Sequence, residues 1–158
     1  MGKVVSLEEL KHIRECLRSQ KKIVVFTNGC FDLIHRGHVE YLLKSKSLGD
    51  ILFVGINTDS SINKIKGNKR PIIPLIDRAF ILANLSPVDY VCPFDDETPL
   101  LLIKTIIPDI LVKGADWEIN DIVGKEIVEG AGGKVETIEF VPNRSTSMLI
   151  EQILKRYT

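Results

Sequence analysis

The sequence has 158 residues, 44% of them hydrophobic and 27% charged, which predicts one compact domain over residues 1–158 that folds without disulfides. Its 21 basic and 21 acidic side chains cancel, which argues against a general nucleic-acid binder or a membrane-surface protein. Three cysteines without a C-x-x-C pair, and the lack of an apolar run of about 18 residues, favour a cytoplasmic protein over a disulfide scaffold, a structural zinc site or a membrane span.

The first expected element is an amphipathic helix that begins after Ser6. Ser6 and Glu9 have the spacing of a capping box, directly before a helical pattern of apolar residues. A short β-branched run at 23–27 then predicts a buried parallel strand. A helix over 37–48 and a second strand over 51–56 follow.

The alternation of strands and helices continues to the end of the chain. Further strands are expected at 90–92, 110–112 and 135–140, and further helices near 75–84, 99–106, 120–129 and 145–157. Because each parallel connection needs a crossover helix, this pattern predicts a parallel sheet covered on both faces. We therefore expect a Rossmann-like, doubly wound α/β fold with a five-stranded sheet, and ligand binding at the carboxyl ends of the strands.

Two histidines, His35 and His38, stand where the helix after the first strand is expected to begin. The free N–H groups and the dipole at this end of a helix favour an anion. Gly29 and Gly37 would leave room for a phosphate near the backbone. A capped turn with solvated histidines, or half of a metal site with Cys30, would explain the same residues. Neither a Walker A pattern nor G-x-G-x-x-G occurs in the sequence.

One stretch, residues 64–70, is dense in positive charge. Such a run is most often a solvated loop. Because it contains Gly67 and few apolar anchors, it also suits a mobile lid over a bound phosphate.

The run Asn28-Gly29-Cys30-Phe31-Asp32, followed by His35, Gly37 and His38, resembles the HxGH nucleotidyltransferase superfamily. Further similar segments are Arg70-Pro71, Asp77-Arg78, the run Lys113-Gly114-Ala115-Asp116-Trp117, and Ser145-Thr146-Ser147. The resemblance spans about residues 23–154 and is strongest to the heptose-phosphate adenylyltransferase branch. Ala115, Trp117, Asn143 and Arg144 depart from the usual residues of that branch.

The resemblance implies an enzyme that joins AMP from ATP to D-glycero-β-D-manno-heptose 1-phosphate, giving ADP-heptose and pyrophosphate for lipopolysaccharide core synthesis. The phosphate nucleophile is already ionised at neutral pH, so the site needs charge and N–H donors rather than a general base. The expected catalytic residues are His35, His38, Arg78, Lys64 and Lys66. The expected binding residues are Thr27, Asn28, Gly29, Cys30, Phe31, Asp32, Gly37, Lys69, Arg70, Lys113, Gly114, Asp116, Ser145, Thr146 and Ser147. Mg²⁺ is expected on ATP, held mostly by phosphate oxygens and water, with no metal site of the protein's own.

Several of these residues have a structural alternative. Asp32 is expected to support the histidine loop through hydrogen bonds, and Cys30 to pack beneath it. Asp116 can lie at the nucleoside end or cap a helix, and Trp117 can stack on the base or close the edge of the core. Ser145 is expected to cap the last helix as well as to bind phosphate.

Two other functions remain open. A cytidylyltransferase that acts on glycerol 3-phosphate or a phosphoalcohol shares the HxGH and Ser-Thr elements, although the wording of residues 27–32 favours the heptose branch. A non-catalytic nucleotide-sensing module would be expected to lose a phosphate donor, and here all are present. The expected partners are ATP, a sugar phosphate and a second copy of the chain in a homodimer. A separate sugar kinase is also expected, since these residues leave no room for a kinase domain. Neither nucleic acid nor a membrane is expected.

Overall fold

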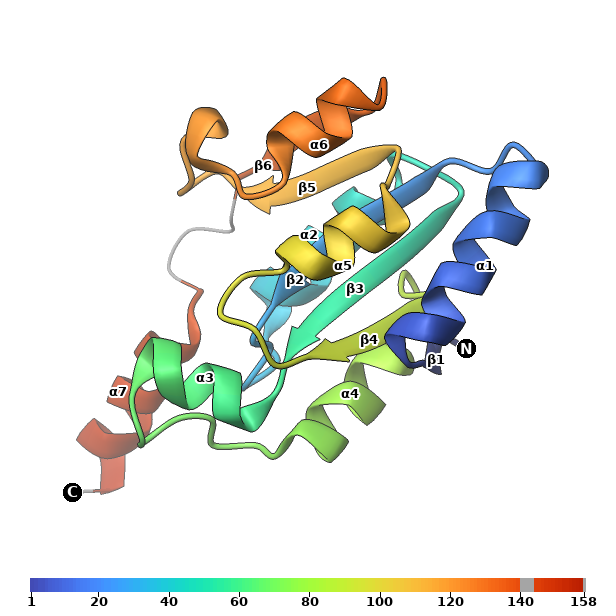
Figure 1. Cartoon of the computed structure of the whole chain (residues 1–158). Coiled ribbons are helices and arrows are strands. Elements are labelled where there is room, and N and C mark those ends of the chain that lie inside the picture. Colours follow the sequence, from blue (N-terminus) through green and yellow to red (C-terminus); the bar gives the residue numbers. More distant parts are fainter. Residues whose placement is uncertain (140–143, 158) are drawn as a thin grey trace.

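In the computed structural model, described for residues 1–139 and 144–157, six parallel strands form one twisted sheet with helices on both faces (Figure 1). Their order across the sheet is β1-β4-β3-β2-β5-β6. The strands are β1 (Lys3–Val4), β2 (Val24–Gly29), β3 (Ile51–Asn57), β4 (Tyr90–Phe94), β5 (Ile110–Gly114) and β6 (Lys134–Ile138). This confirms the expected doubly wound α/β fold, with six strands instead of five.

Two hydrophobic layers hold the helices to the sheet. The helices are α1 (Leu7–Ser19), α2 (Arg36–Lys46), α3 (Asp59–Lys66), α4 (Leu75–Ala83), α5 (Leu100–Ile106), α6 (Lys125–Gly130) and α7 (Thr146–Tyr157), with a 3-10 turn at Ile119–Asp121. Leu42 of α2 and Leu82 of α4 are fully buried in one layer. Leu10 of α1, Ile103 of α5 and Val128 of α6 are buried in the other. Burial on both faces explains why the central strands are almost entirely apolar.

The structure corrects three expectations about these elements. Strand β1 was not expected, because only two residues pair with β4 and both are exposed. The basic stretch begins inside α3, so Lys64 and Lys66 lie on a helix and only 67–70 form the turn after it. The helix expected over 120–129 is divided, because Gly124 adopts a positive φ of 88° at the start of α6. The end of the strand expected over 135–140, Phe140, lies outside the described residues, as does Asn143.

The parallel arrangement brings the carboxyl ends of β2, β3 and β5 to the same edge of the sheet. Residues far apart in the chain therefore meet where the motifs of the sequence were expected to act. Within the described part of the chain, no helix combines the length and the apolar character needed to span a bilayer.

Candidate active site

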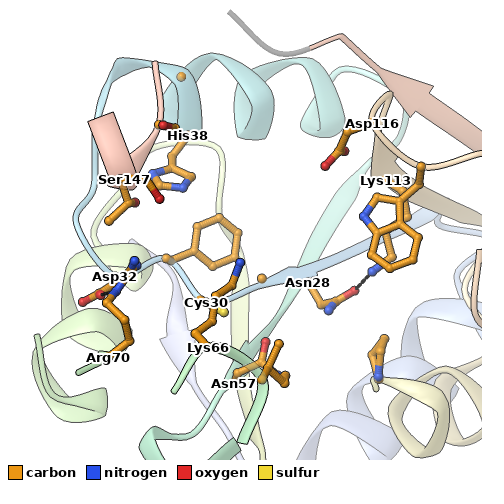
Figure 2. A pocket seen from close by; sticks show the side chains of 18 of the residues that line it. Asn28, Cys30, Asp32, His38, Asn57, Lys66, Arg70, Lys113, Asp116 and Ser147 are labelled. Atoms are coloured by element: carbon orange, nitrogen blue, oxygen red, sulfur yellow. Dashed lines mark hydrogen bonds and ion pairs between the residues drawn. The ribbon is translucent and has the colours of Figure 1, made fainter. Parts of the chain in front are cut away.

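A cavity of about 770 Å³ opens at this carboxyl edge, and Figure 2 shows it from close by. Strand ends, the beginning of α2, the end of α3 and the beginning of α7 form its wall. Fifteen of the expected site residues line it: Asn28, Gly29, Cys30, Phe31, Asp32, His35, Gly37, His38, Lys66, Arg70, Lys113, Asp116, Ser145, Thr146 and Ser147. The fold therefore gathers segments that are separated by more than a hundred residues around one cavity.

The five other expected residues do not line this cavity. Thr27 is fully buried, where its hydroxyl shares a 2.7 Å hydrogen bond with Tyr41. Gly114 is buried at the end of β5. Lys64 is paired with Asp95 at 3.8 Å, and Lys69 is exposed on the turn after α3.

Arg78 is the fifth, and it lies beneath the cavity with no exposed surface. Its guanidinium donates to the carbonyl oxygen of Cys30 at 2.6 Å, to the carbonyl oxygen of Ile73 at 2.9 Å and to Oδ1 of Asp59 at 2.6 Å. These bonds join the loop after β2 to α3 and to the segment before α4. In this structure Arg78 therefore positions the floor of the site and does not reach into the cavity.

His35 and His38 stack on each other at the start of α2, with ring centroids 3.9 Å apart. The ring of Phe31 packs against His38 at 5.3 Å. Among the described residues, Nδ1 of each histidine is a buried polar atom without a hydrogen-bond partner. Such unpartnered nitrogens at a helix N-terminus suit an anionic ligand that can satisfy them.

The two imidazoles are neutral in the free protein at neutral pH. Burial lowers the pKa of His38 to about 4, and the neighbouring His35 adds to this effect. Burial and the positive charge of Arg144 lower the pKa of His35. A bound phosphate would raise the pKa of both histidines, because its negative charge favours the protonated ring.

The glycines of the motif make room for side chains. A Cβ on Gly37 would stand 3.0 Å from Cε1 and Nδ1 of His35 and 3.2 Å from Cβ of Arg144. A Cβ on Gly29 would stand 3.0 Å from the ring of Phe31. Their expected role, room for a phosphate at the backbone, is thus accompanied by a steric one, since both allow the histidine loop to pack closely.

Asp32 is buried and anchors the turn that follows α3. Its carboxylate accepts hydrogen bonds from Nε of Arg70 at 2.6 Å and from the backbone N–H groups of Ile72 and Ile73 at 2.8 Å and 2.9 Å. Burial alone would raise the pKa of Asp32, but these three donors outweigh it and hold the pKa below its usual value. Asp32 was expected to support the histidine loop through hydrogen bonds, and these bonds tie that loop to the segment that carries Arg70.

Lys113 and Asn28 join the ends of β5 and β2. The amine of Lys113 donates to Oδ1 of Asn28 and lies 5.9 Å from the centroid of the Trp117 ring (Figure 2). Burial lowers the pKa of Lys113 to about 8, although the carboxylate of Asp116 acts in the opposite direction. This side of the cavity offers an aromatic face and polar groups, which is the chemistry that a nucleoside requires.

The first turn of α7 completes the opposite side of the cavity. Oγ of Ser145 accepts a hydrogen bond from the N–H of Met148 at 3.2 Å, which confirms the expected cap. Oγ1 of Thr146 donates to the carbonyl oxygen of Leu33 at 3.5 Å and so links α7 to the histidine loop.

Ten residues outside the expected set also line the cavity wall. They are Asn57, Ile65, Glu97, Thr98, Pro99, Trp117, Ile122, Val123, Arg144 and Met148, of which only Trp117 and Arg144 had been considered. Asn57 could have been found, because it is a polar residue at the carboxyl end of an expected strand. The residues that had not been considered, apart from Asn57, had no signal of their own in the sequence, since packing brings them to the cavity.

Comparison with known proteins agrees with this geometry. The cytidylyltransferase-like family model matches residues 26–152. The bifunctional protein HldE of Citrifermentans bemidjiense is 56% identical over 156 residues, which are 99% of this chain and 32% of that protein. HldE of Geobacter sulfurreducens is 53% identical, with the same shares. The chain spans about a third of the length of these curated relatives.

Solved structures give the same result at the level of the fold. The lipopolysaccharide core biosynthesis protein from Thermoplasma volcanium has a TM-score of 0.61 and 27% identity, over 76% of this chain and 97% of that one. The pantoate-beta-alanine ligase from Francisella tularensis has a TM-score of 0.64 over 98% of this chain and 80% of that one, at 16% identity. The second likeness concerns the fold alone. From the family match and the identity to its relatives, the chain belongs to the cytidylyltransferase-like family of nucleotidyltransferases.

Proposed function

We propose that this chain transfers AMP from ATP to D-glycero-β-D-manno-heptose 1-phosphate, giving ADP-heptose and pyrophosphate for lipopolysaccharide core synthesis. The observation that carries the proposal is the stacked, neutral pair His35 and His38 at the start of α2. Lys66, Arg70 and Ser145 line the same cavity, so cationic and hydroxyl groups accompany the histidines. Hydrogen-bond donors and positive charges of this kind are what a phosphoryl-group transfer requires.

In the proposed reaction, an oxygen of the sugar phosphate attacks the α-phosphorus of ATP in line with the bond to the β-phosphate. The new P–O bond forms as the bond to the bridging oxygen breaks, and pyrophosphate leaves with that electron pair. The phosphate nucleophile carries its charge at neutral pH, so no side chain must remove a proton. His35 and His38 would donate to the oxygens of the α- and β-phosphates, where negative charge increases. Arg70, held by Asp32, would stabilise the leaving pyrophosphate.

The residues of the cavity fit a Mg²⁺ ion that ATP itself carries. No group of three or more His, Cys, Asp or Glu side chains that could hold a metal occurs within residues 1–139 and 144–157. Asp32 is fully engaged with Arg70, Ile72 and Ile73, which leaves Asp116 and Glu97 as cavity carboxylates for the water molecules of the ion. When bound, Mg²⁺ would offset part of the phosphate charge.

Two alternatives have a specific basis. The name of the matching family favours CTP as the nucleotide, with glycerol 3-phosphate or a phosphoalcohol as the second substrate. Against this, the HldE proteins of Citrifermentans bemidjiense and Geobacter sulfurreducens are 56% and 53% identical to this chain over the 156 aligned residues. A nucleotide-sensing module would bind ATP without turnover. We also propose that a sugar kinase supplies the sugar phosphate and that the chain acts as a homodimer, which the sedimentation mass can test.

A pyrophosphate-release assay separates these functions. It would combine each of the four nucleoside triphosphates with heptose 1-phosphate, glycerol 3-phosphate and simple phosphoalcohols, in the presence of Mg²⁺. We expect pyrophosphate with ATP and heptose 1-phosphate together, and none with ATP alone, since water lacks the positioned, ionised oxygen. Release with CTP and glycerol 3-phosphate would identify the cytidylyltransferase. If no pair released pyrophosphate while ATP still bound, the sensing module would be correct.

A further inference from the structure

Two carboxamides, Asn28 and Asn57, line the cavity at the ends of the neighbouring strands β2 and β3 (Figure 2). A carboxamide can present either its oxygen or its NH₂ group, and the two look alike unless a hydrogen-bond partner decides between them. Here each amide has a partner of only one kind. The chemistry that each presents to the cavity can therefore be derived.

Asn28 presents a donor. The ammonium group of Lys113 has only donors, so the atom of Asn28 that faces it must be the oxygen. The NH₂ group then points away from Lys113 and has no hydrogen bond to another described residue. The indole of Trp117, 5.9 Å away, covers Lys113 and limits where its amine can move.

Asn57 presents an acceptor. Its NH₂ group donates to Oγ of Ser61 at 2.9 Å, and that hydroxyl donates its only hydrogen to the carbonyl oxygen of Asp96 at 2.8 Å. Ser61 can therefore only accept from Asn57, which fixes the orientation of the amide. The side-chain oxygen of Asn57 has no hydrogen bond to a described residue, although only 3% of Asn57 is exposed.

A fixed donor beside a fixed acceptor suits a ligand with two hydroxyl groups, because one hydroxyl can accept while the other donates. A phosphate would not suit the pair, since the oxygen of Asn57 repels an anion. The edge of a nucleotide base suits this pair less well. The aromatic ring on which a base could stack, Trp117, follows β5, and β2 separates β5 from β3, the strand that carries Asn57.

We propose that Asn28 and Asn57 form a hydroxyl-reading pair that orients a sugar ring of one substrate. That sugar is either the ribose of the nucleotide or the sugar of the sugar phosphate, and the pair deepens the proposed function on which it rests. Lys113 and Ser61 are positioning residues, since each fixes the orientation of one amide without offering its own group to the sugar.

The test compares substrates that lack one hydroxyl. Calorimetry would measure the binding of ATP, 2′-deoxy-ATP and 3′-deoxy-ATP in one arm, and of heptose 1-phosphate and its monodeoxy analogues in the other. For the wild type we expect two analogues in one arm, each lacking one of the two hydroxyls that the pair contacts, to bind about tenfold more weakly, as loss of one buried hydrogen bond predicts. In Asn28→Ala the difference for the hydroxyl that accepts should fall to about twofold or less, and in Asn57→Ala the difference for the hydroxyl that donates, because that hydroxyl no longer has its partner.

Three further variants separate recognition of the hydroxyl groups from an effect on folding. Asn57→Asp keeps an acceptor toward the cavity and should retain the difference for a hydroxyl that donates, even if Asn57→Ala does not fold. Asn84→Ala removes an exposed amide at the end of α4 and should change nothing. Ser61→Ala should reduce the difference without touching the ligand, since the amide of Asn57 is then free to turn.

The result of these measurements either identifies the sugar that the pair binds or refutes the proposed pair. A difference that disappears in the nucleotide arm identifies the ribose, and one that disappears in the other arm identifies the sugar phosphate. Equal differences in wild type and in both alanine variants, or none in the wild type, would refute the pair. Because binding needs no turnover, this result is independent of whether pyrophosphate is released.

Discussion

Nε of Arg70 donates a 2.6 Å hydrogen bond to Oδ2 of Asp32, whose side chain has no exposed surface. The two residues are 38 positions apart and join the histidine segment after β2 to the turn after α3. Since Arg70 also lines the cavity, the bond holds a cation at the cavity wall before any ligand arrives. Such preorganisation avoids the cost of ordering the side chain during the reaction.

Asp32→Asn should therefore weaken both the fold and the reaction. An amide cannot accept from all three donors with the strength of a carboxylate, so the free energy of unfolding should fall by about 1–3 kcal/mol. Urea unfolding would measure the change. Asp77→Asn, at an exposed position in α4, is the matched control and should stay within about 0.5 kcal/mol. An Asp32→Asn protein as stable as the control would contradict the anchoring role.

The stacked histidines give the second prediction. His35→Ala and His38→Ala should each lower the rate of pyrophosphate release by roughly 10²- to 10³-fold, as the loss of one preorganised donor does elsewhere. The far-ultraviolet circular dichroism should not change. His12→Ala removes the third histidine, which is exposed on α1, and should leave the rate unchanged. Near-wild-type turnover in either cavity variant would remove that histidine from the mechanism.

Proton uptake on nucleotide binding is the third prediction. The pKa of His38 is lowered to about 4, so this ring is neutral near pH 6 to 7 in the free protein, and the pKa of His35 is lowered as well. The negative charge of a triphosphate raises the pKa of a nearby imidazole, and the complex should take up protons in this range. Calorimetry in buffers of different ionisation enthalpy measures the number. His35→Ala combined with His38→Ala should abolish most of the uptake, and equal uptake in that variant would contradict the assignment.

The lowered pKa of His38 also makes the stability of the fold depend on pH, in the opposite sense to a histidine that gains a carboxylate partner. Because the pKa of His38 is lower in the folded protein, the unfolded chain binds more protons between its usual value and about 4. The contribution of His38 to stability is therefore complete above this window and is lost as the pH falls through it.

Lys64 and Lys66 form a matched pair for the fourth prediction. Both lie in the last turn of α3, but Lys66 lines the cavity and Lys64 pairs with Asp95. Lys66→Ala should weaken ATP binding by about tenfold, whereas Lys64→Ala should change it by less than about twofold. Amide exchange over 64–70 should slow when ATP and sugar phosphate are added, if this segment closes over them. Equal effects of the two variants would show that α3 contributes only general charge.

The strands that could be predicted are those whose composition reports burial on both faces. Residues 23–27 and 51–56 are apolar and β-branched because helices cover both sides of the sheet there. Strand β1 could not be predicted, since its two residues become a strand only by pairing with Tyr90 and Val91 of β4. Helix α3 was not predicted, because its basic residues favoured a solvated loop. Its N-cap is Thr58, whose Oγ1 accepts a 3.2 Å hydrogen bond from the N–H of Ser61.

The motifs identified most of the cavity wall but little of its internal geometry. His35, Gly37 and His38 are close in sequence, so a local pattern shows that they act together. The bond between Lys113 and Asn28 spans 85 positions and depends on β5 lying beside β2. Likewise, only the packing of α4 shows that Arg78 faces the floor of the site. Long-range register and side-chain direction are what a single sequence does not contain.

The central claim is that an oxygen of the sugar phosphate attacks the α-phosphorus of ATP. Mass spectrometry with heptose 1-phosphate that carries oxygen-18 in all three non-bridging phosphate oxygens tests it most directly. We predict that all three labelled oxygens appear in the nucleotide sugar, one of them as the new bridge, and that pyrophosphate contains none. Label in pyrophosphate, or ADP or AMP as the released product, would contradict it.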